Sequence, residues 1–108
     1  MDDQEFTARA EHALDDLYRR LTAAAEDYDF EVDFNAGALA IEFEEPPGKF
    51  VVSPNSPVRQ IWVSAHSKSF KLDWDQARTA FVLGGSGQTL AGLIGDAVGQ
   101  QLGEKVTL

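Results

Sequence analysis

Clustered carboxylates are the side chains of this sequence with the clearest capacity for chemistry. Five acidic residues lie close together, at positions 26, 27, 29, 31 and 33, and no basic residue occurs between Arg20 and Lys49. Carboxylate oxygens are the ligands that hard cations prefer. This stretch is therefore expected to attract cations or a basic protein surface.

The spacing of these carboxylates limits how tightly they can bind. Acidic and apolar residues alternate from Tyr28 to Phe34, which predicts a strand with Asp29, Glu31 and Asp33 on its solvent face. Side chains two positions apart on a strand are separated by roughly 6.6–6.8 Å, too far to chelate one ion tightly. We expect weak binding of hydrated cations, or of several ions in a row. The alternative is a solvated face that serves only solubility.

An aromatic residue on a polar strand face is the second notable feature. The run from Arg59 to Ala65 alternates, and its aliphatic positions predict a buried face. Trp62 then lies on the opposite, polar face beside Gln60. Exposed aromatic residues of this kind often anchor protein interfaces. The alternative is that the faces are reversed and Trp62 belongs to the core.

A second alternating run, Phe70 to Trp74, is predicted to pair with the Trp62 strand. The hairpin between them would pass through His66-Ser67-Lys68 and bring Lys71 within cross-strand reach of Trp62. The sequence therefore predicts a contact surface made by two adjacent strands.

A helix of about twenty residues is expected before these strands. Its apolar stripe consists of Phe6, Ala10, Ala13, Leu14, Leu17, Leu21 and Ala24. Acid-first pairs at (i, i+4) spacing should partly neutralise its outer face; they are Glu5–Arg9, Asp15–Arg19 and Asp16–Arg20. We also expect His12 to pair with Asp16. Paired carboxylates are poorer cation ligands than those of the strand.

The remaining elements are shorter. Strands are predicted at residues 39–44, 49–53 and 81–83, with a break at Pro46-Pro47-Gly48 and a surface loop at residues 53–57. A last helix is predicted from Gln88 to Leu102. Its glycines at positions 92, 95 and 99 fall opposite the apolar stripe, on a face that we expect to be exposed. Val106 and Leu108 of the tail are expected to pack against the helices.

This order of elements predicts the fold class. Two helices flank five or six antiparallel strands, which implies an α+β two-layer sandwich with both helices on one face of the sheet. A chain of 108 residues supports a single domain, covering residues 1–108. The other sheet face stays wet, and Trp62 lies on it.

Composition excludes several classes of function. The net charge is −9, and most acidic side chains lie in residues 1–45, so nucleic-acid binding is disfavoured. There is no cysteine and no apolar run long enough to span a membrane, and the N-terminus is acidic, unlike a targeting peptide. We therefore expect a cytoplasmic protein with no membrane association. Neither His12 nor His66 has a nucleophile nearby in the sequence, so no hydrolytic triad is predicted and we expect no enzyme.

Several motifs together resemble the frataxin family, in its bacterial CyaY-like branch. They are Glu5-Phe6 at the start of the acidic helix, Asn35-x-Gly37 before Leu39-x-Ile41-x-Phe43, Pro57-x-x-Gln60-Ile61-Trp62, Asp73-Trp74 and the helix from Leu90 to Leu102. The similarity spans nearly the whole chain. It implies a helix–sheet–helix fold with both helices on one sheet face.

The resemblance also implies a function and its residues. It implies weak, surface-bound iron (Fe2+/Fe3+) at Asp3, Glu5, Glu11, Asp15, Glu26, Asp27, Asp29, Glu31 and Asp33. The implied partner-binding residues are Asn55, Gln60, Trp62 and Lys71. The implied partners are a cysteine desulfurase and the scaffold protein on which iron–sulfur clusters are built. A monomer that can oligomerise with iron is expected.

Three functions follow as hypotheses. The first is a non-catalytic, iron-binding regulator of iron–sulfur cluster assembly that acts by docking. The second is iron storage with ferroxidase activity, which would need converging carboxylates and histidines where the sequence shows an open, linear array. The third is an acidic protein-interaction domain that binds no metal.

Overall fold

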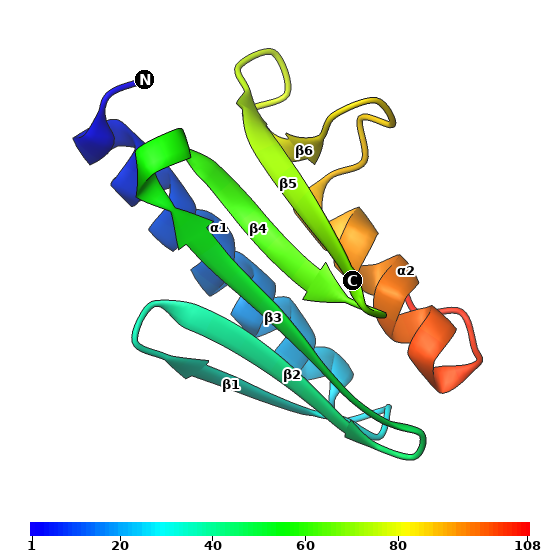
Figure 1. Cartoon of the computed structure of the whole chain (residues 1–108). Coiled ribbons are helices and arrows are strands. Elements are labelled where there is room, and N and C mark those ends of the chain that lie inside the picture. The colour runs from blue at the N-terminus through cyan, green and yellow to red at the C-terminus, as the bar shows by residue number, and fades with distance from the viewer.

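The computed structural model describes residues 1–108 and consists of two helices and a six-stranded sheet (Figure 1). In chain order the elements are α1 (Asp3–Ala24), β1 (Glu31–Asn35), β2 (Ala38–Glu44), β3 (Pro47–Asn55), the 3-10 helix η1 (Ser56–Val58), β4 (Gln60–Ala65), β5 (Lys68–Asp75), β6 (Ala80–Leu83) and α2 (Leu90–Leu102). No helix combines the length and the apolar character that a membrane crossing requires.

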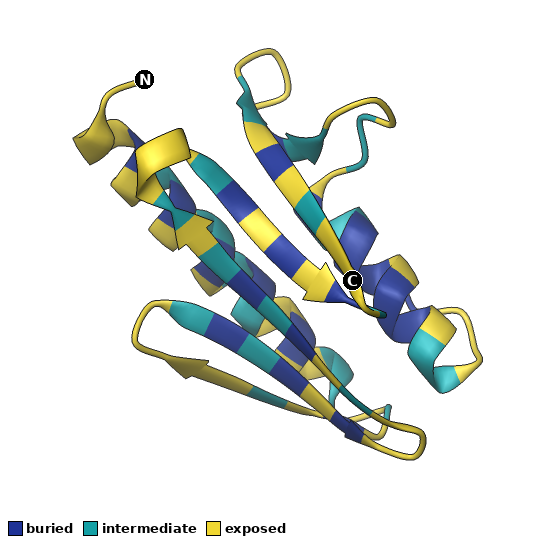
Figure 2. Cartoon of the chain, viewed as in Figure 1, coloured by how far each residue is buried: buried dark blue, intermediate teal, exposed yellow.

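The strands form one antiparallel sheet in the order in which they occur in the chain, β1-β2-β3-β4-β5-β6. Both helices lie on the same side of this sheet, behind the strands in Figure 1. The predicted α+β two-layer sandwich is therefore confirmed, with six strands. Successive side chains of a strand point to opposite faces of the sheet. Along β2 and β4 every second side chain therefore points into the core, as the banding in Figure 2 shows.

The core lies between the helices and the inner face of the sheet. The predicted helix stripe is buried at Phe6, Ala10, Leu14, Leu17 and Leu21. The sheet contributes Leu39, Ile41, Phe43, Phe50, Val52, Ile61, Val63, Ala65, Leu72 and Phe81. Buried apolar surface of this extent is the main favourable contribution to folding.

Both helices begin at a capping side chain. Asp2 accepts a hydrogen bond from the backbone N–H of Glu5 at 2.7 Å, and Thr89 accepts one from Gly92 at 3.2 Å. Such caps satisfy backbone donors that have no partner within the helix. They fix where α1 and α2 start, and α2 starts at Leu90 instead of the predicted Gln88.

Two predicted boundaries around β3 were wrong, because prolines are tolerated at the ends of this strand. Pro47 is its first residue, where a missing N–H is acceptable. Pro54 lies within β3 and pairs with Ile61 of β4, but β2 pairs with β3 no further than Val52. At Pro54 the strand is therefore an edge, and the predicted surface loop is reduced to η1.

The predicted first strand begins later than expected. A turn at residues 25–27 and a bend at residues 28–29 follow α1, and β1 starts at Glu31. Asp29 therefore lies in the lead-in to the strand, while Glu31 and Asp33 lie within it. The turn between β4 and β5 is also tighter than predicted, since His66 and Ser67 alone form it, both with positive φ.

The prediction that the glycine face of α2 is exposed was wrong. Gly95 and Gly99 are buried, because the C-terminal tail lies across them. A Cβ atom at Gly99 would stand 2.7 Å from the carbonyl oxygen of Glu104, and one at Gly95 would stand 3.2 Å from that of Val106. The expected packing of the tail is confirmed, with Val106 only 6% exposed.

Candidate functional site

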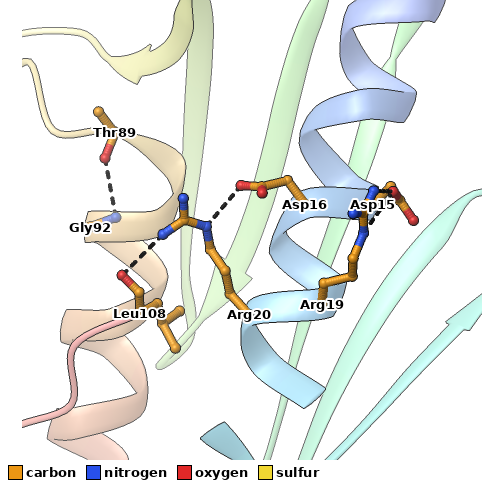
Figure 3. A network of polar contacts seen from close by, with 7 residues as sticks. All are labelled: Asp15, Asp16, Arg19, Arg20, Thr89, Gly92 and Leu108. Atoms are coloured by element: carbon orange, nitrogen blue, oxygen red, sulfur yellow. Dashed lines mark hydrogen bonds and ion pairs between the residues drawn. The ribbon is translucent and has the colours of Figure 1, made fainter. Parts of the chain in front are cut away.

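The acidic residues of α1 are largely engaged with arginines. Asp3 forms an ion pair with Arg59 at 3.0 Å, Glu5 lies 3.8 Å from Arg9, and Asp15 is hydrogen-bonded to Arg19. The last contact is visible at the right of Figure 3. The hydrogen bond and negative charge of Asp15 raise the pKa of Arg19 above its ordinary value. The predicted partial neutralisation of this helix is confirmed.

Asp16 pairs with Arg20, as predicted, but not with His12. It accepts a hydrogen bond from Arg20 Nε at 2.8 Å. Arg20 also donates to the backbone oxygen of Leu108 at 3.2 Å, so that its guanidinium joins α1 to the C-terminal tail (Figure 3). The predicted pairing of His12 with Asp16 was therefore wrong, because the longer arginine side chain reaches the same carboxylate.

The other predicted acidic residues are exposed and form no ion pair; they are Glu11, Glu26, Asp27, Asp29, Glu31 and Asp33. Glu31 and Asp33 project from the outer face of β1, away from the helices. No three carboxylates or histidines come close enough to hold a metal ion together. These residues are suited to weak contact with hydrated cations, and they do not form a chelate.

Two further carboxylates belong to this surface. Glu42 and Glu44 alternate with buried residues on β2, and Glu42 is the cross-strand partner of Glu31. Asp29, Glu31, Glu42 and Glu44 line one open cleft of about 480 Å³. We call these four residues with Asp33 the acidic surface. The alternation of β2 in the sequence indicated that Glu42 and Glu44 point outward, but not that they adjoin β1.

One base partly offsets the acidic surface. Lys49 Nζ lies 3.8 Å from Glu42, and the two residues are cross-strand partners on β2 and β3. Both side chains are more than half exposed, so the pair contributes little to stability. Glu31 and Glu42 face each other across β1 and β2, and a single lysine cannot balance both. The negative charge of this half of the sheet is therefore poorly compensated.

The four predicted partner-binding residues lie together on the same outer face. In the strand register Asn55 pairs with Gln60, and Trp62 pairs with Lys71. These four residues, which we call the Trp62 face, therefore occupy neighbouring positions on β3, β4 and β5. The Trp62 side chain is 38% exposed, while Ile61 and Val63 beside it are buried. The predicted orientation of the strand is confirmed and the reversed alternative is excluded.

Polar contacts hold the Trp62 side chain in place. Its Nε1 donates to Gln60 Oε1 at 3.0 Å, and Lys71 Nζ lies 4.9 Å from the centre of its ring, within the range of a cation–π interaction. Gln60 Nε2 in turn donates to Asp73 Oδ1 at 3.0 Å. Asp73 was not among the predicted site residues, although the alternation of its strand placed it on the polar face.

The outer face is thus divided by charge. Near β4 and β5 the charges of Lys71 and Asp73 balance, and the neighbouring exposed side chains include Ser64 and Ser69. Near β1 and β2 carboxylates predominate. An aromatic anchor in a neutral setting suits a protein contact, whereas the acidic half suits cations or basic side chains.

His66 makes contacts within the fold and does not face either outer surface. Its ring packs edge-on against Phe50 at 5.0 Å, and its Nε2 lies 3.1 Å from the carbonyl oxygen of Ala97 in α2. Because a carbonyl only accepts, Nε2 carries the proton in this contact. The histidine links the β4–β5 turn to α2 and is not part of either outer surface.

Comparison with known proteins gives one family. Residues 1–104 match the family model described as a frataxin-like domain. Two curated relatives are described as the iron-sulfur cluster assembly protein CyaY. The one from Azotobacter vinelandii is 33% identical over 101 residues, which cover 92% of this chain and 91% of the relative. The one from Tolumonas auensis is 31% identical and covers 100% of this chain and 99% of the relative.

A solved structure has the same architecture. Frataxin from Psychromonas ingrahamii, of the CyaY family, superposes with a TM-score of 0.76, covering 99% of this chain and 97% of that chain at 24% sequence identity. At this identity the match shows the fold: two helices on one face of an antiparallel sheet.

Proposed function

This chain belongs to the frataxin family, and we propose that it takes part in iron–sulfur cluster assembly as a docking protein without catalytic activity of its own. The curated relatives named above are described as iron–sulfur cluster assembly proteins, and the match covers nearly the whole length of each. The proposed partners are the cysteine desulfurase and the scaffold protein of that process.

The observation that carries this proposal is the Trp62 face. Trp62 is 38% exposed on the face of the sheet opposite the one on which both helices pack. Large aromatic side chains with polar neighbours contribute strongly to interface affinity when a partner covers them. We propose that this face contacts the scaffold.

The acidic surface supports a second, weaker part of the proposal. Its carboxylates are exposed, oxygen-only ligands, and all but Asp33 line an open cleft. Such ligands bind hard cations through retained water. We propose that iron binds here weakly, and that basic side chains of the desulfurase can use the same carboxylates. Storage and iron oxidation would need a closed site with converging ligands, and no such group is present.

Direct binding tests the proposal. The protein is immobilised, and the desulfurase, the scaffold and their preformed complex from the same organism are passed over it with and without iron(II) under anaerobic conditions. Saturable binding to the complex is expected, and a rise in salt should weaken the part that depends on the acidic surface. Absence of binding to all three, at concentrations up to those of a weak complex, would refute docking.

A further inference from the structure

We propose that Asp73 is a positioning residue for Trp62, and that Trp62 meets its partner through an apolar side chain placed on the indole ring. This inference rests on the proposed docking function. It adds a residue that does not itself contact the partner, and it specifies the chemistry of the partner at the Trp62 contact.

The hydrogen bonds form a chain with one possible direction. The indole Nε1 of Trp62 can only donate, and the carboxylate of Asp73 can only accept. The Gln60 amide lies between them, 3.0 Å from each, and it is the one group of the three with both a donor and an acceptor. Asp73 therefore holds the amide nitrogen on its own side and turns the amide oxygen toward the indole.

The sheet register places the members of this hydrogen-bond chain next to one another. Gln60 and Asp73 are cross-strand partners, as are Trp62 and Lys71 two pairs further along, on the same face of the sheet. Lys71 Nζ lies over the indole at 4.9 Å from the ring centre. The ring is thus held at its nitrogen by Gln60 and on one face by Lys71. A side chain ordered before binding loses less conformational freedom when the partner arrives.

The same contacts define what the partner must offer. The one polar atom of the indole already has its hydrogen-bond partner, so an acceptor on the partner would have to displace Gln60 to use it. The exposed remainder of the side chain is apolar ring surface. Burial of that surface favours an aliphatic or aromatic side chain on the partner. A carboxylate or backbone carbonyl aimed at the indole nitrogen is disfavoured.

Three variants isolate the role of Asp73. Asp73→Ala removes the acceptor, Asp73→Asn keeps an oxygen that can accept from Gln60, and Ser69→Ala changes a neighbouring exposed residue on the same face of β5 that has no side-chain hydrogen bond. The free protein gives the first readout, since the Trp62 indole N–H resonance and its solvent exchange report the Gln60 contact. Asp73→Ala should shift this resonance and speed its exchange, while Asp73→Asn and Ser69→Ala should not.

Affinity for the desulfurase–scaffold complex gives the second readout. Loss of one ordering hydrogen bond is expected to weaken binding of Asp73→Ala about three- to tenfold, with Asp73→Asn and Ser69→Ala close to wild type. Wild-type affinity for Asp73→Ala would overturn the positioning role. Equal weakening of Asp73→Ala and Asp73→Asn would also overturn it, because the charge of Asp73 would then contact the partner directly.

Two Trp62 variants separate this inference from the function on which it rests. Trp62→Phe keeps a ring and loses the N–H, so it should retain most of the affinity that Trp62→Ala loses. If the two variants bind equally weakly, the apolar ring contact is wrong. If Trp62→Ala binds as tightly as wild type, docking through this face is wrong, and the indole resonance alone then decides whether Asp73 orients Trp62.

Discussion

Gly99 of α2 lies directly beneath Glu104 of the tail, so closely that a Cβ atom at Gly99 would stand 2.7 Å from the carbonyl oxygen of Glu104. Backbone atoms cannot yield as a flexible side chain can. Gly99→Ala is therefore expected to displace the tail and to lower the free energy of unfolding by about 1–3 kcal/mol. Chemical denaturation measures this directly, and a variant as stable as wild type would mean that the tail is not packed on α2.

Gly92 provides the matched comparison on the same helix. An added Cβ there would meet only side-chain atoms, the nearest being Thr89 Oγ1 at 3.2 Å. Because alanine is the better helix former, Gly92→Ala is expected to raise stability by up to about 1 kcal/mol. A melting curve tests the sign. A lower melting temperature would show that the Thr89 cap cannot adjust to the methyl group.

Glu31 and Glu42 face each other across β1 and β2, and like charges at such positions destabilise a sheet. Glu31→Gln is expected to stabilise the protein by about 0.2–1 kcal/mol at low salt. The gain should shrink as salt screens the repulsion. A double-mutant cycle with Glu42→Gln isolates the pair, and zero coupling at low salt would contradict this explanation.

Iron(II) or calcium added to the protein is expected to bind the acidic surface weakly, with a dissociation constant of about 10⁻³ M or higher, at or beyond the weak end of the range for oxygen-ligand calcium sites. Chemical-shift mapping should place the largest changes between Asp27 and Asp33 and at Glu42 and Glu44. The paired variants Glu31→Gln and Asp33→Asn should reduce them.

Asp15→Asn serves as the control for this titration, because Asp15 is already bonded to Arg19 and should contribute little. A response centred on α1, or tight binding that survives both strand variants, would contradict a cation site on the acidic surface.

The sequence was most informative where side-chain periodicity reports burial. The buried stripe of α1 follows from its three- and four-residue spacing. The inward face of β4 and the exposure of Trp62 also follow from spacing, because a one-residue slip would reverse every side chain of the strand. The arginine pairs of α1 were also predictable, since residues four apart are neighbours on any helix.

Contacts between distant segments could not be predicted in the same way. The glycine face of α2 looked exposed because the tail that covers Gly99 comes from outside the helix pattern. Pro54 looked like a loop residue because local propensity does not show that the pairing of β3 with β2 extends no further than Val52. Asp73 was missed as a site residue because its hydrogen bond to Gln60 depends on strand register.

The rate of cluster formation by the desulfurase and scaffold, measured with wild-type protein and with Trp62→Ala, tests the central claim most directly. Trp62 is partly exposed, so its loss should cost less than the about 3–5 kcal/mol typical of a buried aromatic residue, and the variant should remain folded. Wild-type protein is expected to change the rate, and folded Trp62→Ala to lose most of that change. A wild-type protein without effect, or a folded Trp62→Ala variant with the full effect, would contradict docking through the Trp62 face.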